Sequence, residues 1–309
     1  MKKIIAGAIA LSLFQSAMAQ PVKQQELRQF GLQSSAVIKE NGATISTTAY
    51  KSKDYWFPVT VPSTVLTGLV ANKVYPDPYT GMNNMLIPDA SDSFNHQFGL
   101  EKYSHLPGEP NPWKKPYWYR TTFEVPAGDK GKFFQLVFKG INYRADVWLN
   151  GTQISDSSQM AGMFAEYFLN VSDVIKAGTQ NVLAVKIYQL DEPGLPAPPQ
   201  TEGLGDFFLN GGPTGDIGKN VTMLSSIGWD WIPEVHDRNI GIWQPVYLRT
   251  SGKVVIEHPR LITDLPIYPI LPLRSFLCSW LSRIITLPLP VASCWSRFSR
   301  KPLPVQVSR

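Results

Sequence analysis

The sequence predicts an all-β domain with the architecture of a sandwich or jelly roll. Short strand-like runs follow one another from residue 117 onward, and turn residues separate them roughly every ten positions. Few helical patterns interrupt these runs. With 309 residues and 43% hydrophobic content, the chain can bury a sizeable core in one large domain or two small ones.

The expected strands follow in chain order. The segment 55–61 (YWFPVTV) is expected to be extended, and 143–149 alternates so that Ala145, Val147 and Leu149 share one face. Further strands are expected at 117–125, 133–138, 164–169, 181–188, 244–250 and 253–257. Asn150-Gly151 is the strongest hairpin signal in the chain.

One short helix is expected among these strands. Pro62-Ser63-Thr64 begins it, and an apolar stripe continues it to Ala71. A loop rich in helix-breaking residues follows at 76–84.

The amino terminus has the features of a secretory signal. Lys2 and Lys3 precede an apolar run at 4–14, and the small residues Ala17 and Ala19 fit a signal-peptidase site. The apolar run is shorter than the roughly 20 residues that span a bilayer. We therefore expect a signal peptide at 1–19, a mature chain that begins at Gln20, a periplasmic or secreted protein, and no membrane span after signal removal.

The carboxyl-terminal segment differs in composition from the rest. Residues 266–309 contain no Gly, Asp, Glu or Asn, although Pro, Ser, Leu and Arg are frequent. We interpret 260–309 as the start of a next domain that gives way to an out-of-frame or misassembled basic tail; a natural membrane-surface tail is the alternative. Both cysteines, Cys278 and Cys294, lie there, so the domain expected at 20–259 is held together without disulfides.

The net charge of +5 is not a property of the expected domain. Residues 20–265 hold 21 Lys and Arg against 24 Asp and Glu. A slightly acidic domain gives no reason to expect nucleic-acid binding. The glycine-rich piece 212–220 departs from a phosphate-binding loop at Pro213 and Asn220, and the scattered histidines do not form a metal-ligand pattern.

The stretch 228–248 (GWDWIPEVHDRNIGIWQPVYL) contains the candidate binding residues. Sugar rings stack on indoles with their C–H faces, whereas their hydroxyls need hydrogen-bond partners. Trp229, Asp230 and Trp231 supply both kinds of group, which favours a carbohydrate site. The alternative is that Trp229, Trp231 and Trp243 are core residues of a sandwich.

Several segments together resemble the amino-terminal domain of family 2 glycoside hydrolases, in the branch of exo-β-glucosaminidases, β-mannosidases and endo-β-mannosidases. These segments are 61–70 (VPSTVLTGLV), 76–84 (PDPYTGMNN), 118–126 (WYRTTFEVP), 138–151 (FKGINYRADVWLNG) and GWDW with DRNIGIWQPVYL in 228–248. The resemblance covers most of residues 20–265. It implies a galactose-binding-domain-like jelly roll that packs beside a catalytic (β/α)8 barrel.

The resemblance also implies roles for single residues. Asp230 would bind the terminal β-linked sugar, with Trp229 and Trp231 in the pocket wall; a structural carboxylate beside Arg238 is the alternative. From the residues themselves, we expect Asp237, Arg238 and Asn239 to form an ion pair and turn. We expect His236 to be solvated, with contact to a sugar hydroxyl as the alternative. Asn142, Tyr143 and Arg144 are expected at a turn and on an exposed sheet face.

The resemblance implies chemistry that this chain is not expected to perform alone. Relatives of this kind retain configuration and use two glutamates of the barrel, about 5 Å apart. Neither glutamate is expected here, and Glu234 and Glu257 are not substitutes because nothing places a second carboxylate opposite them. No cofactor is expected, and Asp173 or Asp206 could join a structural calcium that the spacing does not require.

The functional prediction is thus a sugar-binding domain of an exported, exo-acting retaining β-glycosidase of the β-mannosidase or exo-β-glucosaminidase type. The alternatives are a free-standing carbohydrate-binding module and a non-functional gene fragment.

Overall fold

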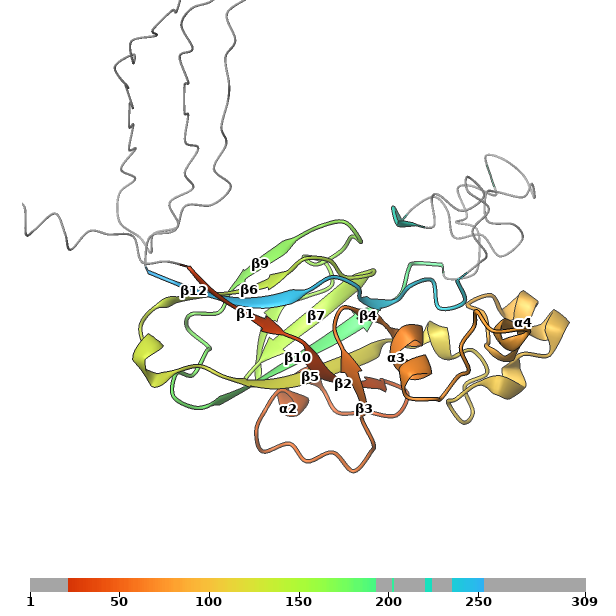
Figure 1. Cartoon of the computed structure of the whole chain (residues 1–309), viewed down its shortest axis with the longest axis horizontal. Helices are drawn as coiled ribbons and strands as arrows, with labels where there is room; N and C mark the ends of the chain where they lie inside the picture. Colours follow the sequence, from red (N-terminus) through yellow and green to blue (C-terminus); the bar gives the residue numbers. More distant parts are fainter. Residues whose placement is uncertain (1–21, 193–201, 203–219, 224–234, 253–309) are drawn as a thin grey trace, which may run out of the picture. The chain divides into compact units, whose positions relative to one another are not determined.

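The computed structural model describes residues 22–192, 202, 220–223 and 235–252. Contacts divide the chain into a unit of Val22–Thr250 and a unit of Met1–Pro21 with Ser251–Arg309, of which only Ser251 and Gly252 are described. The expected signal peptide and basic tail therefore lie outside the described residues. Antiparallel sheets dominate the first unit (Figure 1), which confirms the all-β prediction.

The larger sheet has six strands in the spatial order β3-β2-β5-β10-β7-β8. Its strands are β2 (Gln29–Ser34), β3 (Phe57–Thr60), β5 (Tyr117–Glu124), β7 (Arg144–Leu149), β8 (Thr152–Ser155) and β10 (Gln180–Tyr188). The two central strands, β5 and β10, pair along the whole length of β5.

A four-stranded sheet has the order β1-β12-β6-β9, and a small two-stranded sheet pairs β11 with β4. The strands are β1 (Lys23–Leu27), β6 (Phe133–Phe138), β9 (Tyr167–Asn170), β12 (Val246–Ser251), β4 (Ser63–Thr64) and β11 (Gly241–Ile242). In the small sheet Gly241 pairs with Thr64. The residues just before the helix that begins at residue 65 therefore lie beside the residues just before β12.

The main core lies between the two larger sheets. Leu136 of β6 and Leu248 of β12 pack in one cluster with Val147 of β7 and Val185 of β10, and all four are at most 2% exposed. Burial alternates along β7 with Ala145, Val147 and Leu149 inside, as predicted. Two sheets that bury their facing sides in this way form a β-sandwich.

The hairpin at Asn150-Gly151 is confirmed. Both residues have positive φ, 53° and 91°, and they join β7 to β8. Asn and Gly adopt this backbone region at low cost, which is why the pair is a strong hairpin signal. The Asn150 side chain also accepts from the Val182 N–H at 3.0 Å and so fixes the turn to β10.

The predicted short helix is α3 (Val65–Ala71), and its N-cap is Thr64, whose hydroxyl accepts from the Thr67 N–H. Two further helices were not predicted: α2 (Gly42–Ile45) and α4 (Asp92–Phe98). Single 3₁₀ turns lie at Asn83–Leu86, Glu101–Tyr103, Pro112–Lys114 and Ala127–Asp129. In the part of the chain described, no helix is both long and apolar enough to cross a bilayer.

Helix α2 covers a second, smaller hydrophobic cluster. Ile45 packs there with Trp118 of β5 and Ala184 of β10, on strands that also face the main core. Gly42 lies so close to the Trp148 indole that a Cβ at this position would come within 2.1 Å of a ring atom. Both central strands are consequently buried on two sides.

An aromatic cluster lies beside α4. His105 accepts or donates at Nδ1 with the Tyr75 hydroxyl at 2.9 Å and at Nε2 with the Tyr117 hydroxyl at 3.3 Å. The Trp113 indole packs against the Tyr75 and His105 rings. Burial lowers the pKa of His105 to about 4, so the imidazole is neutral at physiological pH.

The expected strand at 164–169 begins later than predicted. Strand β9 starts at Tyr167, and Phe164 lies in the preceding loop with 60% of its surface exposed. The expected strand at 253–257 lies outside the described residues.

Candidate functional site

The predicted sugar-binding residues Trp229, Asp230 and Trp231 lie outside the described residues, as does Glu234. The nearest described residues are 220–223 before them and 235–252 after them. The site is therefore built from its two flanks and from the groove that the following residues line.

A buried ion pair holds the flank after the predicted site. Arg238 donates from Nη1 to Asp89 Oδ2 and from Nη2 to Asp89 Oδ1, each at 2.9 Å. Both side chains are 1% exposed. Two parallel hydrogen bonds of this kind fix orientation as well as distance, and Arg238 Nη1 also donates to the Val235 carbonyl at 2.9 Å.

His236 belongs to the same network. Its Nδ1 lies 2.8 Å from Asp89 Oδ2, and its Nε2 lies 3.1 Å from the Asn84 carbonyl oxygen. The residue is only 3% exposed, so the expectation of a solvated loop histidine is wrong. A carboxylate on one ring nitrogen and a carbonyl on the other explain how this polar ring can be buried.

The backbone around Asp89 prepares the carboxylate for these partners. The Ser91 N–H donates to Asp89 Oδ1 at 2.7 Å. The Asn95 side-chain amide accepts from the Asp89 N–H and donates to the Asp89 carbonyl. Burial alone would raise the pKa of Asp89, but the His236 and Arg238 hydrogen bonds and the Arg238 charge hold it below its usual value. Asp89 is therefore an ionised, fully paired carboxylate.

The turn predicted at 237–239 is present, whereas the predicted ion pair differs, because the carboxylate that Arg238 pairs with is the distant Asp89. Asp237 instead accepts from the Leu66 N–H in the first turn of α3 at 2.9 Å and from the Asn239 N–H at 2.9 Å. Complete burial raises its pKa, and these hydrogen bonds only partly oppose the shift.

Asn142, in the connection between β6 and β7, supports the same turn. Its side-chain amide donates to the Arg238 and Asn239 carbonyls, both at 2.9 Å, and those two residues have φ of 51° and 58°. Asn142 is 1% exposed. Asn142 thus serves a turn, as expected, but from a buried position, where its amide satisfies the carbonyls of the two left-handed residues.

The flank before the predicted site is held at two points. The Asn220 amide exchanges hydrogen bonds with Asp191, from the Asp191 N–H at 2.8 Å and to Asp191 Oδ2 at 3.0 Å. Arg144 of β7 pairs with Asp191 at 2.6 Å. Met223 donates its N–H to the Met163 sulfur at 3.3 Å. The described residues that flank the predicted site are therefore held in place on both sides.

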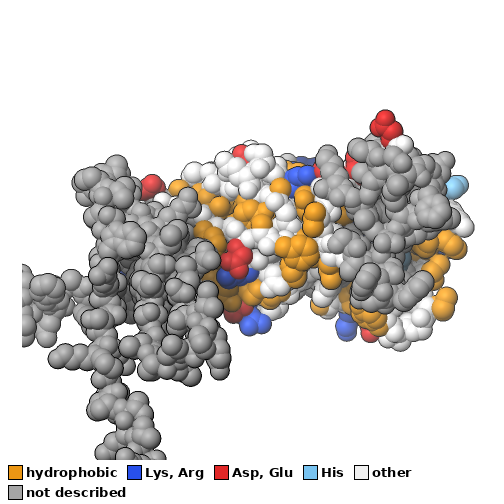
Figure 2. Space-filling view, turned by 90° about the horizontal axis from the view of Figure 1, so that it is seen from above, with side chains coloured by type: hydrophobic (Ala, Val, Ile, Leu, Met, Phe, Trp, Pro, Cys, Tyr) orange, Lys and Arg blue, Asp and Glu red, His pale blue; other side chains and the backbone are white. Residues whose placement is uncertain are grey.

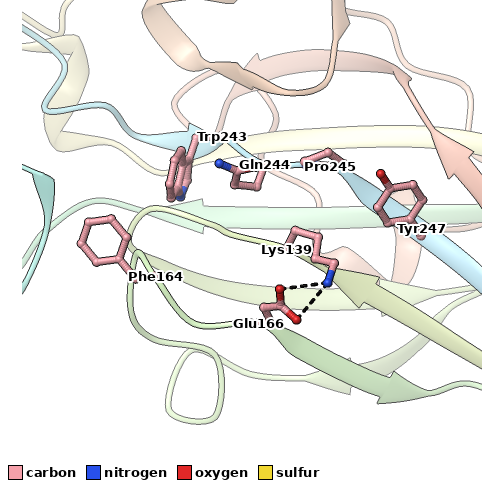
Figure 3. Close-up of a pocket in the computed structure, with 7 residues that line it drawn as sticks. All are labelled: Lys139, Phe164, Glu166, Trp243, Gln244, Pro245 and Tyr247. Carbon is pink, nitrogen blue, oxygen red and sulfur yellow. Dashed lines mark hydrogen bonds and ion pairs between the residues drawn. The ribbon is translucent and has the colours of Figure 1, made fainter. Parts of the chain in front are cut away.

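A groove opens next to this flank, with a volume of about 430 Å3. We call it the aromatic groove; its lining residues are Lys139, Phe164, Glu166, Trp243, Gln244, Pro245 and Tyr247. Figure 3 shows the Trp243 and Phe164 rings together at one end, Tyr247 at the other, and the Lys139–Glu166 ion pair between them. Trp243 is thus a groove residue rather than a fully buried core tryptophan.

Two contacts fix the Trp243 ring. Its indole N–H donates to the Met163 carbonyl at 3.0 Å, and the Phe164 ring meets it edge to face at 5.9 Å between centroids. Gly140 makes room for this arrangement, because a Cβ there would come within 2.8 Å of the indole nitrogen. Sequence reasoning identified the neighbouring segments but missed Phe164 and Glu166, which it assigned to a strand.

No group of three or more His, Cys, Asp and Glu side chains suited to a metal ion occurs within the described ranges. Asp173 lies there and has no such neighbours, whereas Asp206 lies outside them.

Comparison with known proteins identifies the domain. Residues 44–105 and 109–244 match the family model of the glycosyl hydrolase 2 galactose-binding domain-like domain. This chain belongs to that family. The match includes the buried Arg238–Asp89 pair, both flanks of the predicted site and most of the aromatic groove.

Curated relatives are much longer than this domain. The chain is 35% identical over 211 residues to a mannosylglycoprotein endo-β-mannosidase of Lilium longiflorum, a match that covers 68% of this chain and 19% of the relative. It is 28% identical over 239 residues to an exo-β-D-glucosaminidase of Streptomyces avermitilis, covering 77% of this chain and 20% of that protein. The family 2 domain thus spans about a fifth of the length of these relatives.

Solved structures agree with the fold. The exo-chitosanase CsxA of Amycolatopsis orientalis superposes with a TM-score of 0.55 at 24% identity, over 79% of this chain and 22% of that one. A β-D-mannosidase of Dictyoglomus thermophilum gives a TM-score of 0.50 at 22% identity, over 79% and 24% of the two chains. Both likenesses concern the fold of the amino-terminal domain.

Proposed function

We propose that this chain is the sugar-binding domain of an exported, exo-acting retaining β-glycosidase of the β-mannosidase or exo-β-glucosaminidase type. Asp230 is the residue that binds the terminal β-linked sugar in this proposal, with Trp229 and Trp231 as the pocket wall. The contribution of this chain in the proposal is sugar binding.

The buried network after the predicted site carries the proposal. A bidentate arginine–carboxylate pair, a buried histidine and a buried asparagine converge on residues 235–239, immediately after the GWDW segment. Precise support next to a binding segment lowers the entropy lost when a ligand orders it. Membership of the galactose-binding-like family supports the same reading.

Calorimetric titration of the chain with methyl β-mannoside and with glucosamine tests the role of Asp230. We expect weak binding near the millimolar range, about −4 kcal/mol. Asp230→Ala should abolish it, because a carboxylate accepts strongly from sugar hydroxyls in a partly dry site. Asp173→Ala, which removes an exposed carboxylate elsewhere, is the matched control.

Binding that survives in Asp230→Ala would refute the assignment of this residue. Absence of monosaccharide binding in the folded wild-type chain would mean that the pocket is complete only beside a barrel. The same preparation should show no hydrolysis of p-nitrophenyl β-mannoside or p-nitrophenyl β-glucosaminide, and measurable turnover would contradict a contribution limited to sugar binding.

A further inference from the structure

The aromatic groove combines rigid rings with polar groups in one concave surface. Its volume of about 430 Å3 falls within the range of small-molecule sites. Phe164 lines the groove, exposes 60% of its surface and meets the Trp243 ring edge to face. Trp243 behind it is held in place by the Met163 carbonyl. The rings therefore form a fixed platform that needs little reorganisation to accept a ligand.

The polar groups of the groove include both donors and acceptors. Lys139 Nζ lies 2.9 and 3.0 Å from the two Glu166 oxygens, and these side chains are 36% and 42% exposed. Among the described residues, the Gln244 amide and the Tyr247 hydroxyl have no hydrogen-bond partner. The groove thus presents a planar amide, a phenol and a charged pair to whatever occupies it.

The charge balance of the groove favours an uncharged occupant. The Lys139 ammonium is already neutralised by Glu166, because its Nζ contacts both carboxylate oxygens. An anionic ligand would have to compete with this carboxylate for Lys139. A sugar chain meets no such competition: its C–H faces stack on the rings, and its hydroxyls use the amide, the phenol and the paired charges. On the face seen in Figure 2, hydrophobic side chains likewise lie among acidic and basic ones.

We propose that the aromatic groove is a second carbohydrate-binding site, which holds an uncharged β-linked oligosaccharide separately from the terminal sugar at Asp230. The choice of a β-linked sugar rests on the proposed function, whereas the groove itself is defined by the described residues. Phe164, supported from behind by Trp243, stacks on one sugar. Tyr247 lies along the chain, and Glu166 and Gln244 bind hydroxyls between them.

Calorimetric titration of the whole chain with β-1,4-linked mannotetraose and with N-acetylchitotetraose tests the groove. We expect at least one of them to bind, and α-linked maltotetraose to bind more weakly. Phe164→Ala should weaken binding about tenfold, or about 1.4 kcal/mol. Glu166→Gln keeps the shape of the side chain but not its charge, and it should weaken binding severalfold.

Tyr55→Ala is a closely matched control. Tyr55 is 64% exposed and meets Phe57 edge to face at 5.2 Å, so its removal mimics the Phe164 change outside the groove. It should leave oligosaccharide binding unchanged. Thermal unfolding of all variants verifies that each is folded before titration.

The outcomes separate this site from the one at Asp230. Loss with Phe164→Ala but not with Asp230→Ala supports the groove, even if monosaccharides fail to bind. Equal binding by wild type and Phe164→Ala overturns the proposal, as does a folded wild type that binds neither β-linked tetrasaccharide. Loss with Asp230→Ala alone would instead support only the terminal-sugar site.

Discussion

At the scale of single residues, two buried aspartates that lie close to the same turn have opposite electrostatics. Asp89 receives two arginine hydrogen bonds and one from His236, whereas Asp237 relies on backbone N–H groups. The pKa of Asp89 is therefore lowered and that of Asp237 is raised. An ion pair that loses one partner in the interior leaves an uncompensated charge, so the two positions should respond differently to neutralisation.

Asp89→Asn should destabilise the domain by about 3–5 kcal/mol, because it removes the carboxylate that makes two hydrogen bonds with the buried Arg238 guanidinium. Urea unfolding measures the loss. Asp237→Asn is the matched comparison and should cost less, since its amide oxygen can still accept from the Leu66 N–H without burying a charge. A smaller loss for Asp89→Asn than for Asp237→Asn would contradict this account of the network.

The same two carboxyls set opposite pH dependences. The stability from Asp89 is present above the unfolded pKa of about 4 and is lost as the pH falls through its lower folded value. The contribution of Asp237 is present below about pH 4 and is lost as the pH rises through its higher folded value. Only differences between a variant and the wild type isolate either residue.

His105 adds a third, separable pH effect. Its pKa is about 4 in the folded protein and about 6.5 when unfolded, so its contribution is present above pH 6.5 and is lost as the pH falls toward 4. His105→Phe should flatten this part of the unfolding free energy, measured in urea at pH 7, 5.5 and 4.

The partners in the buried network could not have been predicted from sequence. Asp89 and Arg238 are 149 positions apart, and nothing local to either residue names the other. The DRN triplet did predict a structural turn, because Asp and Asn favour such backbone. His236 was misjudged because an isolated histidine in a loop carries no signal for burial; only the distant carboxylate creates its site.

At the scale of elements, the strands were more predictable than the helices. Period-two burial in β7 and the Asn-Gly turn are local signals, and both were confirmed. Helix α2 has only four residues, too few for a hydrophobic period to appear, and the one residue that α4 buries is the polar Asn95. Contacts with other elements stabilise them instead, such as the packing of Gly42 on Trp148.

Gly42→Ala tests the dependence of α2 on this close approach. The added methyl would fall inside the Trp148 indole, so either the helix or the ring must move, at a cost of about 1–3 kcal/mol. Chemical denaturation followed by tryptophan fluorescence measures the change. Gly128→Ala adds the same methyl where no atom lies within 4 Å, and it should be close to neutral. Equal effects at both glycines would show that the contact is not tight.

At the scale of the whole molecule, the sequence predicted the sandwich, and it proposed a binding segment and an export signal that remain predictions. The candidate site is divided in the same way: its supporting flanks are described, whereas Trp229, Asp230 and Trp231 are known only from their resemblance. The aromatic groove was not anticipated, because its residues come from three separate strand ends and loops.

Export can be tested directly. Expressed in a Gram-negative host, the chain should appear in the periplasm with Gln20 as its first residue, as determined by mass spectrometry of the intact protein. Ala19→Arg should block processing, because signal peptidase requires a small residue there. Ala10→Val preserves the apolar run and should be processed normally. A cytoplasmic protein that keeps Met1 would exclude the signal.

The pairing of β1 with β12 has a consequence for how the protein is made. Lys23 to Leu27 align with Thr250 to Val246, so the first strand of the fold lies beside its last. A chain emerging in order from a ribosome or a translocation channel cannot complete the four-stranded sheet until almost all of the domain has emerged. Until then β1 lacks its partner strand β12, and molecular chaperones that protect unpaired strands would act during that interval.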